Sequence, residues 1–113
     1  MHEVSLMADT LDIAIEHTKR QGGYKIHWLK MRIGELSGVV PAALEFAFDV
    51  VTKGTIAEGA RLEIELVPVI CYCSKCQQKF QPVDLFYECP QCQEISTDIQ
   101  QGKEIELTSL EVS

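Results

Sequence analysis

Apolar residues recur at helical spacing in two stretches of the chain. Across residues 4–20 they follow one another in steps of three and four, while charged residues fall mostly between them, so one face of a helix is apolar. Gln21-Gly22-Gly23 ends this helix, because glycine readily adopts the left-handed conformation found there. A second helix is predicted to begin at Pro41, where the missing N–H costs nothing, and to continue over residues 42–53 as far as Gly54.

Three further stretches alternate between apolar and polar positions, as strands do. Residues 24–34 are apolar on both faces, with Ile26 opposite Leu29, which predicts a long strand in the centre of its sheet. Residues 61–68 alternate cleanly, and residues 105–110 have a similar pattern. Because these last two runs resemble each other and flank a different kind of segment, we expect them to pair as neighbouring strands.

The segment between those two runs, residues 69–98, is rich in Cys and Gln and is too long to be an ordinary loop. We therefore predict the α+β class: two helices packed on a small mixed sheet of about three strands, with an inserted four-cysteine β subdomain similar to a zinc ribbon. The predicted domains are an α+β domain, residues 1–68 plus 99–113, and the inserted domain, residues 69–98.

Composition and charge exclude several classes of protein. A chain of 113 residues that is 46% hydrophobic and 24% charged is not disordered, and no apolar run approaches the roughly 20 residues of a membrane span. Glu3 and Asp9 replace the basic start of a signal peptide, so we expect a cytoplasmic protein. The net charge of −7 argues against a phosphate-binding surface, so neither nucleic acid nor a membrane is expected as a partner.

Four of the five cysteines form two CxxC pairs separated by twelve residues: Cys73, Cys76, Cys89 and Cys92. Each pair makes a tight turn that presents two thiolates to one ion, and four sulfurs supply the tetrahedron that Zn(II) accepts. Four protein ligands leave no position for an activated water, so the zinc is predicted to be structural rather than catalytic.

The cysteine segment cannot bury enough surface on its own, so the metal is expected to contribute much of its folding energy. Phe80, Phe86 and Tyr87 are predicted to form its small core. A redox function is less favoured, because neither CxxC pair opens a helix after a strand. The fifth cysteine, Cys71, is interpreted as a free thiol beside the hinge; the alternative is a ligand that exchanges with Cys73.

The N-terminus offers a second set of metal ligands. With His2 directly after Met1, the terminal amine, the amide of His2 and its imidazole can reach one ion, and the amide of Glu3 can complete a plane. Tetragonal nitrogen coordination suits Ni(II) or Cu(II). Taken alone the signal is weak, and without further evidence a solvated N-terminal histidine is the better explanation.

Several motifs in a fixed order resemble the HypA family of hydrogenase nickel-maturation factors, with its relative HybF, over essentially the whole chain. They are MHEVSL at the start, RIGELSGV after the first strand, FAFDVVTKGTIAEGARLEIE in the middle, and CxCxxC followed by CPxC. The resemblance implies that Met1, His2 and Glu3 are the nickel-site residues and that the four CxxC cysteines bind zinc.

The resemblance also implies a function and partners. The expected function is that of a non-enzymatic nickel metallochaperone, with nickel as cargo, that acts in maturation of nickel–iron hydrogenase. The implied partners are a HypB-type nickel GTPase and the large subunit of the hydrogenase, with urease maturation factors as a further possibility. A homodimer that exchanges a strand or the zinc domain is compatible with the predicted architecture, and the sequence leaves the oligomeric state open.

Two observations stand apart from the family pattern. Some members carry an acidic residue in the loop before the second helix, whereas residues 37–41 here, SGVVP, contain no carboxylate. His17 and His27 match no ligand position, and His17 is expected on the polar side of the first helix. The alternative function is that of a zinc-ribbon module that binds nucleic acid or protein. Residues 69–98 contain two lysines and four acidic residues, a balance opposite to that of a phosphate-binding surface.

Overall fold

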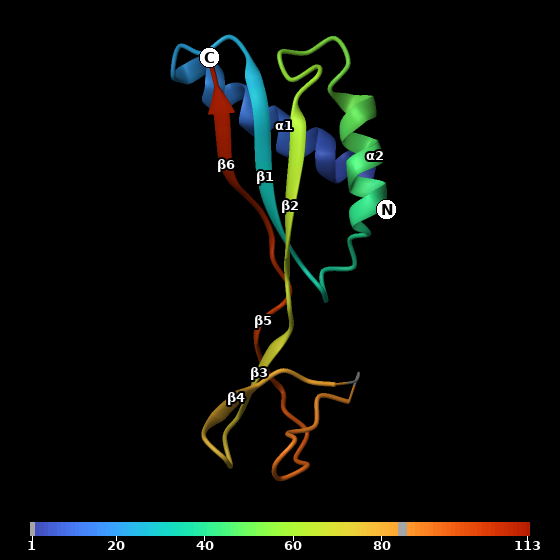
Figure 1. The fold of residues 1–113 in the computed structure, drawn as a ribbon, viewed down its shortest axis with the longest axis vertical. Coiled ribbons are helices and arrows are strands. Elements are labelled where there is room, and N and C mark those ends of the chain that lie inside the picture. The colour runs from blue at the N-terminus through green and yellow to red at the C-terminus, as the bar shows by residue number, and fades with distance from the viewer. Residues whose placement is uncertain (1, 84–85) are drawn as a thin grey trace.

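Two small β-sheets follow one another along the long axis of the molecule, which measures 54 × 26 × 16 Å (Figure 1). The computed structural model describes residues 2–83 and 86–113. Neither helix in this part of the chain is long and apolar enough to cross a membrane. The elements, in chain order, are α1 (Glu3–Arg20), β1 (Ile26–Gly34), α2 (Pro41–Val51), β2 (Arg61–Val67), β3 (Ile70–Cys73), β4 (Gln78–Phe80), β5 (Asp98–Gln101) and β6 (Ile105–Val112).

The first sheet has the strand order β2-β1-β6 and is mixed, as predicted. β1 pairs in parallel with β2 and antiparallel with β6, so it is the central strand. The expectation that the two similar alternating runs are neighbours is wrong, because β1 lies between them. Alternation reports only which side chains are buried, and it carries no information about which edge of β1 a strand joins.

Both helices cover the same face of this sheet, and their apolar sides form the main core with β1 (Figure 1). The buried side chains with the largest share in this core are Met7, Leu11, Leu44, Phe48, Ile26, Leu29, Met31 and Ile33. Gly22 follows the C-cap residue Gln21 of α1 and has a φ of +80°, so the helix ends where the sequence predicted.

Two bulges alter the simple alternation of the strands. A register shift between Ile26 and Trp28 brings Ile26 into the core together with Leu29, although strict alternation places these two on opposite faces. A second shift leaves Thr108 of β6 without a counterpart on β1. Its hydroxyl donates instead to the carbonyl oxygen of Lys30, at 3.2 Å.

The second sheet has the order β4-β3-β5 and is antiparallel throughout. Its small core contains Phe80, as predicted, with Tyr87 packed against it. Phe86 does not belong to this core, because its side chain is 65% exposed. β5 runs across the predicted domain boundary at residues 98 and 99, so the division of the chain into domains stays a prediction.

The two sheets meet where three segments of the chain touch. The amide of Leu36 donates to the carbonyl oxygen of Gly102 at 2.7 Å, and the Glu35 carboxylate accepts from the amide of Val69 at 2.8 Å. Gly34 has no room for a side chain, since a Cβ there would lie 2.1 Å from the Gly102 oxygen. The chain therefore passes between the sheets at a point of close backbone contact.

We expect Gly34→Ala to destabilise the protein strongly, because the added methyl group must push one backbone segment away from another. A loss of about 3 kcal/mol in the free energy of unfolding is expected, as for severe overpacking. Gly38→Ala is the matched control: its φ is +82° but no atom lies within 4 Å of its Cβ position. Its cost should be about 1 kcal/mol. Urea unfolding followed by circular dichroism measures both, and equal losses would contradict the close contact.

The face of the first sheet that carries neither helix is held by ion pairs. The Glu65 carboxylate lies 3.2 Å from the Lys30 ammonium group and 3.4 Å from the Arg32 guanidinium group. Arg32 also forms an ion pair with the Glu106 carboxylate at 3.2 Å. The hydrogen bond from Lys30, followed by the positive charges of Lys30 and Arg32, lowers the pKa of Glu65 from its ordinary value of 4.5. The pairs join all three strands across the open face.

A lowered pKa in the folded state means that Glu65 adds stability above its unfolded pKa, and that this stability is lost as the pH falls through the folded pKa. The urea midpoint of the unaltered chain should therefore fall as the pH is lowered below about 4.5. Glu65→Gln should flatten this part of the profile, and high salt should reduce the difference between the two proteins. An unchanged profile in the variant would show that the ion pairs carry no net stability.

Candidate metal centres

The four predicted zinc ligands are brought together at the far end of the second sheet. Cys73 ends β3 and Cys76 lies in the turn before β4, while Cys89 and Cys92 lie in a second turn closed by a bridge between Glu88 and Ile95. The residue after each CxxC pair, Gln77 or Gln93, has a positive φ, of 54° and 62°. The two turns are therefore built alike, and each directs a pair of sulfurs toward the other.

The sulfur atoms are spaced as a tetrahedral zinc site requires. All four lie within 4.8 Å of one another; Cys73 and Cys92 are 3.6 Å apart, and Cys76 and Cys89 are 3.9 Å apart. Zinc–sulfur bonds of about 2.3 Å in a tetrahedron place the sulfurs about 3.8 Å apart. The observed separations lie on either side of this value, so the four thiolates form a metal-binding cluster that fits structural zinc.

The electrostatics of the cluster also favour a cation. Contact with the sulfur of Cys92, followed by burial, raises the pKa of the Cys76 thiol to about 12. Hydrogen bonds from the backbone N–H groups of Cys92 and Gln91 lower the pKa of Cys89 to about 7. Four thiols in contact cannot all ionise by themselves, because each thiolate repels the next. A divalent ion at the centre would stabilise all four thiolates, which is the chemistry of zinc and other thiophilic metals.

Cys71 lies outside this cluster. It is fully buried in the middle of β3, paired with Phe80 on one side and Ile99 on the other. Burial, followed by the negative charge of Asp98, raises the pKa of its thiol. In this arrangement Cys71 is a small apolar core residue, consistent with the interpretation as a free thiol.

The N-terminal candidate site lies apart from the cluster, at the start of α1 and beside the start of α2 (Figure 1). Met1 is outside the described residues, and His2 is the exposed residue that precedes α1. The first hydrogen bond of α1 runs from the amide of Leu6 to the carbonyl oxygen of His2, at 2.9 Å. The amides of His2 and Glu3 are therefore among those that a helix start leaves without a helical partner.

The contact that Glu3 makes with the loop before α2 is not apparent from the sequence. Its carboxylate accepts a hydrogen bond from the amide of Val40 at 3.1 Å, and this bond is the first cause of the lowered pKa of Glu3. In a capping box the third residue of a helix supplies such a carboxylate, but this position in α2 is Ala43. Glu3, which belongs to α1, supplies this carboxylate to the start of α2 instead. The loop before α2 has no acidic residue, but the backbone amide of Val40 in this loop still contacts the N-terminal site.

The remaining histidines join neither site. His17 is exposed on α1, as expected, and the Nε2 atom of His27 contacts the hydroxyl of Ser113. Within residues 2–83 and 86–113, the four-cysteine cluster is the group of His, Cys, Asp and Glu side chains with the spacing of a metal site.

This combination of a two-helix α+β fold and a four-thiolate cluster defines a small metal-handling protein, and comparison with known proteins gives its family. The family model described as "Hydrogenase/urease nickel incorporation, metallochaperone, hypA" matches residues 1–112. The hydrogenase maturation factor HypA of Picosynechococcus sp. is 57% identical over 99% of both chains, and that of Acidithiobacillus ferrooxidans is 42% identical over the same share. The chain therefore belongs to the HypA family of nickel metallochaperones and hydrogenase maturation factors.

Solved structures agree with this assignment. The solution structure of the Ni metallochaperone HypA from Helicobacter pylori matches with a TM-score of 0.68 and 30% identity, covering 99% of this chain and 97% of that one. A second solution structure of a HypA protein matches with a TM-score of 0.74 and 30% identity, covering 100% of this chain and 97% of that one. The predicted fold class is thus confirmed by the structure and by its neighbours.

The cluster predicts about one zinc ion per chain, and replacing a ligand should remove it. We expect Cys89→Ser and Cys92→Ser to lose most of the bound zinc, because three thiolates bind less tightly and leave the fourth position to water. Cys71→Ser is the control, since Cys71 lies outside the cluster and its replacement should leave the zinc content near that of the unaltered protein. Elemental analysis of the purified proteins measures all three, and equal zinc loss in the control would contradict the assignment.

Proposed function

We propose that this chain is a nickel metallochaperone that binds Ni(II) at its N-terminus and delivers it during maturation of nickel–iron hydrogenase. The observation that carries the proposal is the exposed His2, followed by the half-buried Glu3 at the start of α1, in a chain whose residues 1–112 match the HypA family. The proposed nickel ligands come from Met1, His2 and Glu3, and the proposed zinc ligands are Cys73, Cys76, Cys89 and Cys92.

The local structure suits binding through backbone nitrogen. Ni(II) in a planar site displaces amide protons, and a helical amide would first have to give up its hydrogen bond. The amides of His2 and Glu3 precede the first helical bond, so their deprotonation breaks no bond of the α1 ladder. The resulting negative charge offsets that of the ion, which helps at a helix N-terminus, where the dipole repels cations.

Release follows from the same exposure. A site built from consecutive residues at the chain end leaves the faces of a planar complex open, so a ligand of the receiving protein can attack before the first ligands depart. The hydrogen bond between Glu3 and Val40 holds the start of α1 against the start of α2, so the backbone next to His2 is fixed in position. We propose no enzymatic step, because the four thiolates would saturate the zinc and the nickel is cargo.

The partners proposed are those of the family's pathway: a HypB-type nickel GTPase and the hydrogenase large subunit, with urease maturation factors as a further recipient, in the cytoplasm. The alternative, a zinc-ribbon module for nucleic acid, is not favoured. Of the two lysines in the cysteine segment, Lys75 already faces Glu94 at 3.9 Å, which reduces the positive charge available to a phosphate.

Nickel titration of the untagged protein tests the proposal. One diamagnetic, planar Ni(II) site per chain is expected, and it should be lost in His2→Ala and in a version whose N-terminal amine is acetylated, because each change removes one of the nitrogen ligands. His17→Ala is the matched control, since it removes another exposed histidine of the same helix. Absorption spectroscopy and calorimetry measure binding, and zinc content verifies folding. Tight planar binding that survives both N-terminal changes would refute the site.

A further inference from the structure

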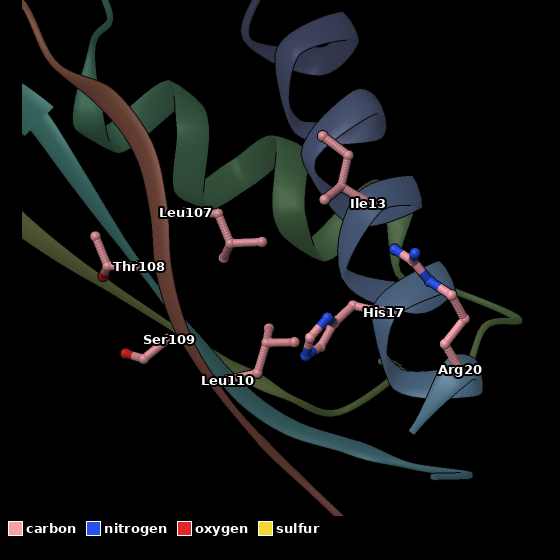
Figure 2. Close-up of a pocket in the computed structure, with 7 residues that line it drawn as sticks. All are labelled: Ile13, His17, Arg20, Leu107, Thr108, Ser109 and Leu110. Carbon is pink, nitrogen blue, oxygen red and sulfur yellow. The ribbon is translucent and has the colours of Figure 1, made fainter. Parts of the chain in front are cut away.

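A groove lies between the C-terminal half of α1 and strand β6, at the end of α1 remote from His2 (Figure 2). Its volume is about 310 Å³, and it is formed by Ile13, His17 and Arg20 of the helix and by residues 107–110 of the strand. We call it the α1–β6 groove. Neither the zinc cluster nor the N-terminal site contributes a residue to it.

The strand side of the groove is an open sheet edge. Within the described parts of the chain, β6 pairs with β1 alone, so the backbone N–H and C=O groups on its other side have no strand partner. Such an edge is a ready template for an added strand, and edge addition is a common way to recognise an extended peptide.

The bulge in β6 gives this edge its apolar floor. Strict alternation places Leu107 and Leu110 on opposite faces, but the unpaired Thr108 turns both of them toward α1, while Thr108 and Ser109 point away (Figure 2). Opposite them Ile13 is 61% exposed, so the helix wall of the groove also offers an accessible apolar side chain. An apolar side chain of a bound segment would find contacts on both walls.

The mouth of the groove is basic, in a chain whose net charge is −7. The last turn of α1 carries His17, Lys19 and Arg20, and the nearest carboxylate to Arg20 is Glu16, at 3.9 Å in an exposed pair that holds little energy. On β6, Glu106 is engaged with Arg32 on the other face of the sheet. The charge that complements this mouth is therefore negative.

We propose that the α1–β6 groove binds an extended segment of a partner protein, which joins the sheet as a strand beside β6 and directs apolar and acidic side chains into the groove. Side chains two residues apart share one face of a strand and are about 7 Å apart. An apolar residue can therefore meet Leu107, Leu110 and Ile13 while the acidic residue two positions along meets His17 and Arg20.

The groove is distinct from the proposed nickel site. His17 lies fifteen positions after His2 along the helix, which corresponds to about 22 Å. A partner held at the groove would leave His2 and Glu3 accessible, so docking and metal transfer would use opposite ends of the same helix. The proposal stands on the groove alone and does not require that the chain bind nickel.

A synthetic octapeptide tests it by fluorescence anisotropy. The probe is fluorescein-labelled, has threonine at every second position, and alternates valine and glutamate at the others, so that one strand face is apolar and acidic. We expect saturable binding below about 1 mM. Binding should be lost when lysine replaces glutamate, and when alternate backbone nitrogens are methylated so that no strand pairing can form. Absence of binding at 1 mM, or equal binding of the methylated peptide, would overturn strand addition.

Matched variants of the protein test which of its residues contact the peptide. Arg20→Glu and Ile13→Thr should each weaken binding about tenfold, as expected for a central charge contact and an apolar contact. Lys53→Glu and Val50→Thr are the controls: they reverse a positive charge and replace an aliphatic side chain at exposed positions outside the groove. Each should alter binding less than about twofold. His2→Ala should leave peptide binding unchanged, which separates this outcome from the nickel experiment. Self-association of the chain that Arg20→Glu abolishes would assign the groove to a second copy and overturn the proposal.

Discussion

Strand β1 is hydrogen-bonded on one side to the strand that leads out to the second sheet and on the other side to the strand that returns from it. Its last residue, Gly34, lies against the backbone of Gly102, so the outgoing and returning segments are held together where they leave the first sheet. The second sheet continues from this clamp. Its strands β3 and β5 pair because their chains are already adjacent when they emerge, which reduces the entropy cost of closing the inserted segment.

Beyond the clamp, the second sheet has only a small core, and we expect a cation held by its four clustered cysteines to contribute much of its stability. Three short strands with few buried side chains cannot bury enough surface to be stable alone, and four sulfurs in contact repel one another once ionised. The same metal would relieve the repulsion and close both turns. The N-terminal region differs: there the protein contributes an exposed, firmly held start of α1, fixed by Glu3 on Val40, and few side chains. A closed site suits a metal that stays, and an open site suits a metal that leaves.

Helix α1 connects the two surfaces for which we propose a function. The proposed nickel ligands lie at its N-terminal end, its middle is packed into the main core through Met7, Leu11 and Ala14, and its last turn forms the basic wall of the α1–β6 groove. A helix fixed along its length keeps these ends at a constant separation. A partner that docks at one end can therefore approach the other without distorting the core.

The sequence by itself determined the two helices, the three strands of the first sheet, the fold class and the four-cysteine metal-binding cluster. Helical and strand periodicities locate the apolar faces, and CxxC spacing is a local property that survives without knowledge of the fold. The tertiary structure decided what depends on contacts between distant segments: that β1 separates β2 from β6, that Glu3 caps a different helix, and that a bulge at Thr108 turns two leucines toward α1. Periodicity reports how a side chain is oriented on its own element, whereas pairing, capping and groove formation depend on which elements meet, and no local pattern encodes that.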